Sequence, residues 1–126
     1  MVDPILDALA IVESDKNPDA IGDRGKAVGM FQAWPIAVDE ANRIIGREKN
    51  PLWTYKDRRN PQQARAMAKA TLDFHYKRGV TDPVKLGGKW RDPYGKVARR
   101  ERLEGKTDQK VYERKLRSVL EYLKNK

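Results

Sequence analysis

The feature that most constrains this chain is the stretch from Glu13 to Pro35, ESDKNPDAIGDRGKAVGMFQAWP. It begins with a carboxylate at the end of an apolar segment. The apolar residues recur at helical spacing and are Ile5, Leu6, Ala8, Leu9 and Val12. Glu13 prolongs this stripe, and a carboxyl group among apolar neighbours is desolvated, which suits it to act as a general acid near neutral pH. The alternative interpretation is an exposed Glu at a fraying helix end.

The residues after Glu13 carry turn chemistry. Residues 17–29 contain Asn-Pro, Gly-Asp and Arg-Gly pairs and few apolar positions. We therefore predict a small β-hairpin or ribbon there. Pro35 then begins a second helix that we expect to bury Ala37, Val38, Ala41, Ile44 and Ile45 and to end at Gly46.

Four short motifs in this stretch follow one another at a spacing that resembles the catalytic segment of the lysozyme-like superfamily. The resemblance is to soluble lytic transglycosylases (SLT domains) and goose-type lysozymes in particular. The motifs are Glu13-Ser14, Asn17-Pro18-Asp19-Ala20, Gly22-Asp23-Arg24-Gly25 and Gly29-Met30-Phe31-Gln32. The resemblance implies one domain over residues 1–126 with a lysozyme-like α+β fold. The fold would be predominantly α, with a small β-ribbon beside the catalytic helix.

The resemblance also implies cleavage of peptidoglycan at the β-1,4 bond between MurNAc and GlcNAc. Glu13 would be the catalytic acid and then the base, while the sugar's own 6-hydroxyl attacks and gives a 1,6-anhydro product. Asp23 matches a helper carboxylate of the goose type, but a second goose-type Asp would fall near Trp34 and is missing. We therefore expect a lytic transglycosylase. The alternatives are a goose-type hydrolytic lysozyme that uses Asp23 and a catalytically weakened module that binds the cell wall.

Five further residues are candidates for substrate binding: Ser14, Gln32, Trp34, Tyr55 and Trp90. Each also has a purely structural interpretation: a helix-end hydroxyl for the serine, a turn-stabilising amide for the glutamine, and core packing for the aromatics. Trp90 occupies the place of a groove aromatic that the family follows with Asn-Gly. Here Arg91-Asp92 stands instead, a departure that affects the expected floor of the groove.

Charge is distributed unevenly along the chain. Residues 1–45 carry 4 basic and 8 acidic residues, whereas residues 46–126 carry 23 basic and 10 acidic residues, within a total net charge of +9. A basic half indicates a polyanionic partner, either nucleic acid or the bacterial cell wall. No base-reading motif is present, so we expect glycan strands of peptidoglycan as the partner and no specific nucleic acid. The simplest alternative is a set of solvated helix faces.

Other function classes find little support. The chain has no cysteine and one histidine, His75, without metal-ligand spacing, so we expect no metal and no cofactor. No apolar run approaches the roughly 20 residues that span a bilayer. The N-terminus lacks the features of a signal peptide, and we expect a monomer that acts at the cell wall in the periplasm, outside the cell or on a phage virion.

The second half of the chain is predicted to be helical in three places. Asn60-Pro61 begins a helix that ends at Gly79, Asp82-Pro83 begins a short one that reaches about Trp90, and a last one runs from about Thr107 to Lys124. Residues 91–106 are predicted to be irregular and basic.

Overall fold

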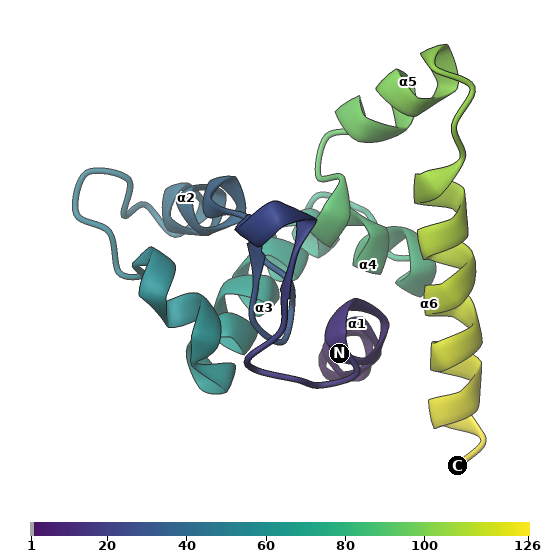
Figure 1. Ribbon diagram of the computed structural model, residues 1–126, viewed down its shortest axis with the longest axis horizontal. Coiled ribbons are helices and arrows are strands. Elements are labelled where there is room, and N and C mark those ends of the chain that lie inside the picture. Colours follow the sequence, from purple (N-terminus) through teal and green to yellow (C-terminus); the bar gives the residue numbers. More distant parts are fainter. Residues whose placement is uncertain (1) are drawn as a thin grey trace.

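Helix α1 (Asp3–Ser14) lies near the middle of the molecule, and other helices pack around it (Figure 1). The computed structural model describes residues 2–126. Within them the remaining elements are β1 (Ile21–Gly22), η1 (Asp23–Gly25), β2 (Ala27–Val28), α2 (Pro35–Ile44), η2 (Tyr55–Arg59), α3 (Pro61–Lys77), α4 (Pro83–Arg91), α5 (Lys96–Leu103) and α6 (Asp108–Lys124). The fold is the predicted mainly helical α+β type, with one two-stranded antiparallel sheet in the described part.

The apolar stripe of α1 forms the centre of the core. Leu6, Ala8 and Leu9 are fully buried, and they pack with residues of α3, α4 and α6. At the crossing of α4 with α6, a Cβ on Gly87 would lie 2.3 Å from a methyl carbon of Leu116 and 3.1 Å from Ile5. The glycine therefore lets α4 approach both α1 and α6 closely, which fixes α6 beside the catalytic candidate.

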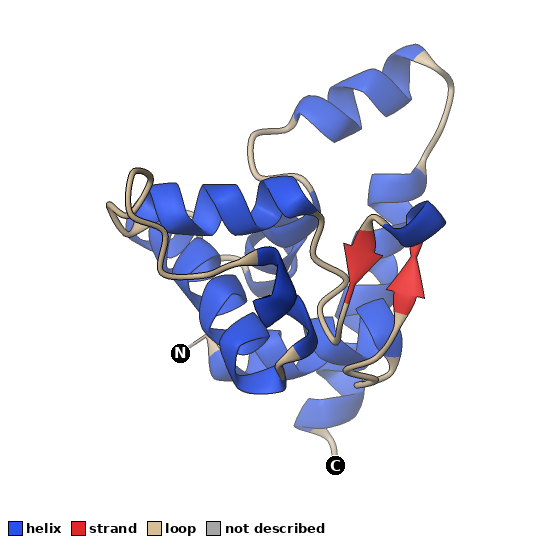
Figure 2. Cartoon of the chain, turned by 60° about the vertical axis from the view of Figure 1, so that its left-hand side comes forward, coloured by secondary structure: helices blue, strands red, loops and turns tan. Residues whose placement is uncertain are grey.

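The predicted ribbon forms, and it is very short (Figure 2). Ile21 pairs with Val28 and Gly22 with Ala27. Helix η2 supports the ribbon, because the Arg58 guanidinium donates to the carbonyl oxygens of Lys26 and Ala33 at 3.0 and 3.1 Å. At Gly29, with φ +88°, a Cβ would lie 1.8 Å from the Arg58 carbonyl oxygen, so glycine is required there for both reasons.

Helices α2 and α3 enclose a second, smaller apolar cluster of Val38, Ala41, Trp53 and Met67. The predicted start of α3 is confirmed: the Asn60 side chain accepts from the backbone amides of Gln62 and Gln63. The predicted inner face of α2 is partly wrong. Ile45 is 38 % exposed, while Asn42 is buried and binds the backbone of Trp53. The buried amide holds the loop after α2, which a hydrophobic pattern does not reveal.

Two further predictions are corrected. The pair Asp3-Pro4 predicts Asp3 as the helix cap and Pro4 as the first helical residue. Instead, Asp3 is the first residue of α1, and the residue before it, Val2, makes no side-chain cap. Residues 91–106, expected to be irregular, contain α5, which stands apart from the rest of the molecule at the top of Figure 1. The Asp92 carboxylate begins this helix by accepting from the amides of Val97 and Ala98 at 3.0 and 2.9 Å. None of the helices in residues 2–126 is long and apolar enough to cross a membrane.

Candidate active site

Glu13 lies in the last turn of α1, where the helix ends and the chain turns towards the ribbon. The backbone leaves the helix through Asp15 and Lys16, both with positive φ. Glu13 is partly buried, and this burial raises the pKa of its carboxyl group from 4.5 to about 7. The group is therefore able to hold a proton at neutral pH and also to release it, as a residue that acts first as acid and then as base must do.

Two groups from distant parts of the chain oppose the effect of burial. The Tyr112 hydroxyl of α6 donates to Glu13 Oε2 at 2.9 Å, and this hydrogen bond lowers the pKa of Glu13. The positive charge of Arg91, at the end of α4, lowers it further. Burial, with the adjacent carboxylate, raises the pKa of Tyr112 well above 10, so the phenol stays protonated and keeps its donor role.

Arg91 is held in place by contacts with α5 and α6. Its guanidinium donates to Gln109 Oε1 at 2.7 Å and to Glu101 Oε2 at 3.1 Å, and it lies 5.9 Å from the centre of the Tyr112 ring. Glu101 is 7 % exposed, and its other carboxylate oxygen accepts from the backbone amide of Gln109 at 2.8 Å. The arginine that replaces the expected Asn is thus a fixed cation beside the catalytic candidate.

Glu13 lines an open pocket of about 250 Å³. It lies between the ends of α1 and α4 and the first half of α6. Its lining residues are Val12, Glu13, Arg91, Asp108, Val111, Tyr112 and Lys115. A carboxyl group with a raised pKa at the edge of such a pocket can reach a ligand from solvent.

Ser14 and Gln32 fasten the ribbon segment to the end of α1. The Ser14 hydroxyl donates to the Met30 carbonyl oxygen at 2.7 Å and accepts from the Asn17 amide at 3.1 Å. The Gln32 amide nitrogen donates to the carbonyl oxygens of Ala20 and Gly29 at 3.0 and 2.9 Å. Both side chains thus have structural partners, which gives weight to the structural interpretation of these two candidates.

Asp23 and Trp34 contact each other across the ribbon. The indole nitrogen of Trp34 donates to Asp23 Oδ2 at 3.1 Å, and Lys26 Nζ lies 5.2 Å from the centre of the Trp34 ring. The charge of Asp23 also raises the pKa of Glu13, by less than the other causes. Trp34 is 40 % exposed, so its ring offers a face for stacking.

Like Trp34, the two remaining aromatic candidates do not line the Glu13 pocket. Trp90 is 7 % exposed, packs edge-on against Phe31 and donates to the Phe31 carbonyl oxygen at 2.8 Å. Its ring therefore belongs to the core and has little surface for a sugar. Tyr55 is exposed on η2, where its hydroxyl binds the Asp39 carboxylate at 3.0 Å.

Sequence reasoning missed Tyr112 and Arg91 as members of the site. Tyr112 lies in the predicted last helix and is buried, but no local pattern points to a carboxyl partner 99 positions away. For Arg91 a signal existed, because the arginine departs from the family's Asn-Gly. Within residues 2–126, no group of three or more His, Cys, Asp or Glu side chains could hold a metal ion.

Comparison with known proteins gives one match. A family model described as "Transglycosylase SLT domain" matches residues 2–110. The match includes Glu13, the ribbon and Arg91, and it ends just before Tyr112. No curated protein and no solved structure matches the chain.

Proposed function

Because the chain belongs to the transglycosylase SLT domain family, we propose that it cleaves peptidoglycan glycan strands with Glu13 as its one catalytic carboxyl group. Membership of the family indicates cleavage of glycosidic bonds in the cell wall. Our proposal adds the residue, the bond and the product: Glu13, the MurNAc-β-1,4-GlcNAc bond and a 1,6-anhydro end. The observation that carries it is the position of Glu13, a largely desolvated carboxyl group that lines an open pocket; this burial raises its pKa to about 7.

In the first step, protonated Glu13 donates its proton to the glycosidic oxygen as the bond to the MurNAc C1 breaks. The carboxylate left behind is stabilised by the hydrogen bond from Tyr112 and the charge of Arg91. In the second step, this carboxylate accepts the proton of the 6-hydroxyl of the same sugar while that oxygen bonds to C1. No external water is consumed, and the product carries a 1,6-anhydro ring.

The contact between Asp23 and Trp34 favours this intramolecular step over hydrolysis. Hydrolysis of the goose type would need Asp23 to orient a water molecule, but one of its oxygens already accepts from the Trp34 indole. An attacking hydroxyl within the same sugar needs no such help, since it is already held next to C1. Asp23 then serves to fix the ribbon turn.

A pair of carboxamide variants tests the proposal on purified peptidoglycan, followed by loss of turbidity. Glu13→Gln is expected to lower the rate by about 10²–10⁴-fold, because it removes the titratable proton. Asp23→Asn is expected to keep most of the activity, since an amide oxygen can still accept from Trp34. Circular dichroism spectra of both variants check that they fold.

Three results would change the assignment. If Glu13→Gln keeps most of its activity, Glu13 is not the acid. If Asp23→Asn loses as much activity as Glu13→Gln, the enzyme is a hydrolase of the goose type. Wild-type protein that binds walls but leaves them intact would be a weakened binding module.

A further inference from the structure

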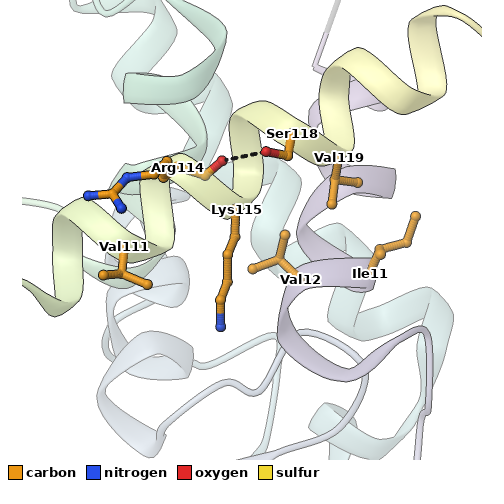
Figure 3. Close-up of a pocket in the computed structure, with 7 residues that line it drawn as sticks. All are labelled: Ile11, Val12, Val111, Arg114, Lys115, Ser118 and Val119. Atoms are coloured by element: carbon orange, nitrogen blue, oxygen red, sulfur yellow. Dashed lines mark hydrogen bonds between the residues drawn. The ribbon is translucent and has the colours of Figure 1, made fainter.

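A second pocket adjoins the Glu13 pocket, between α1 and α6, with a volume of about 520 Å³ (Figure 3). Its lining residues are Ile11, Val12, Val111, Arg114, Lys115, Ser118 and Val119. Three of them, Val12, Val111 and Lys115, also line the Glu13 pocket. The two hollows therefore form one continuous surface along α6.

The lining combines apolar surface with positive charge. Figure 3 shows Ile11, Val12 and Val119 between the two helices, with the Lys115 side chain extending beside Val12. Val111 is 37 % exposed and adds apolar surface to the lining. Two of the lining residues are basic and none is acidic. Among the described residues, Lys115 makes no ion pair, so its charge is available to an anion.

We propose that this pocket binds the stem peptide that peptidoglycan carries on its MurNAc sugars. The inference rests on the proposed function, because it takes peptidoglycan as the substrate. The stem peptide begins on the sugar whose C1 is attacked, so it leaves the strand next to the Glu13 pocket. Its first residues offer methyl groups and free carboxylates, which match the valine-lined wall and the unpaired Lys115. The volume lies within the usual range of ligand pockets, about 300–1,000 Å³.

The family match does not assign this pocket. Five of its seven lining residues come from α6 at positions 111–119, beyond the matched residues 2–110. The same stretch of α6 supplies Tyr112 to Glu13. A peptide held along α6 would thus set the position of the sugar relative to the catalytic carboxyl group.

Ser118 provides the test, because it lines the second pocket and not the Glu13 pocket. Its side chain is exposed, and its hydroxyl donates to the Arg114 carbonyl oxygen at 3.1 Å. Ser118→Glu places a negative charge in the pocket, and Ser118→Gln is the control of nearly equal size without charge. The substrates are peptidoglycan with its stem peptides and the same glycan strands after an amidase has removed them.

We expect Ser118→Glu to lower kcat/KM on peptide-bearing strands about fivefold relative to Ser118→Gln, as one like-charge contact near the surface would do. On peptide-free strands both variants should have the kcat/KM of the wild type. Equal kcat/KM for both variants on peptide-bearing strands would overturn the proposal. So would an equal loss by Ser118→Glu on both substrates.

A binding measurement separates this proposal from the proposed function. If the wild type cleaves neither substrate, the proposed function fails, and the pocket is tested with the tetrapeptide that the amidase releases. We expect the peptide to shift the methyl NMR signals of Val12 and Val119, and more weakly in Ser118→Glu than in Ser118→Gln. No shift in the wild-type protein at millimolar peptide would overturn the pocket assignment.

Discussion

Glu13 is poised by opposing effects that come from different parts of the chain. Burial raises its pKa, while the Tyr112 hydroxyl and the Arg91 charge lower it, and the balance is a pKa of about 7. Since this value exceeds the 4.5 of an unfolded Glu, ionisation of Glu13 weakens the native state. The stability that protonated Glu13 provides below pH 4.5 is lost as the pH rises through about 7. The apolar stripe of α1 predicts the burial, but not the two groups that limit its effect.

Replacement of Tyr112 by Phe tests this balance. The hydrogen bond from Tyr112 lowers the pKa of Glu13, so its loss raises that pKa. The alkaline limb of the pH profile of kcat/KM, where Glu13 loses its proton, is therefore expected to move to higher pH. The rate should also fall at least about tenfold, because a hydrogen bond to a charged group contributes about 1.5–3 kcal/mol.

Tyr122→Phe is the matched control, since Tyr122 is an exposed tyrosine on the same helix. It should leave the profile unchanged. An alkaline limb that stays in place or moves to lower pH in Tyr112→Phe would contradict the role of the phenol.

At the scale of elements, helix starts and turns were predictable because their signals are local. Asn60 and Asp82 cap α3 and α4 as their sequences indicate. The turn residues before Gly29 predict the ribbon for the same reason. Helix α5 escaped prediction because its cap, Asp92, precedes it by several residues and reaches its first turn across Pro93 and Gly95. Gly87, which weakens a helix on propensity alone, is needed for the close crossing with α6.

The start of α5 gives a prediction at this scale. Asp92→Ala removes the acceptor of the Val97 and Ala98 amides and should cost about 1 kcal/mol of stability, the usual value of an N-terminal helix cap. Amide hydrogen exchange at these two residues should accelerate, while exchange in α3 stays slow. Asp92→Asn, which keeps an acceptor oxygen, should lose less stability. If amide exchange at Val97 and Ala98 is equal in both variants and the wild type, Asp92 does not hold the start of α5.

At the scale of the whole molecule, the fold joins three segments that the sequence keeps apart. Glu13 comes from the acidic first third, whereas Arg91, Tyr112 and Lys115 come from the basic remainder. The sequence allowed prediction of the lysozyme-like fold, because the motifs that indicate it are local. The same motifs single out Glu13 as the proposed catalytic carboxyl group. It did not predict the pocket, because the pocket depends on how α6 packs against α1 (Figure 1). Two basic residues of the second half, Arg91 and Lys115, line the Glu13 pocket, where a peptidoglycan strand with its carboxylates would lie.

Mass spectrometry of the fragments released from purified peptidoglycan tests the central claim, that Glu13 alone directs an intramolecular cleavage. The wild type is expected to release muropeptides with 1,6-anhydro ends, each lighter by one water molecule than the product of hydrolysis. Glu13→Gln, at equal concentration and with an unchanged circular dichroism spectrum, should release none above background. Fragments that carry reducing ends, or the same anhydro fragments from Glu13→Gln, would contradict the account.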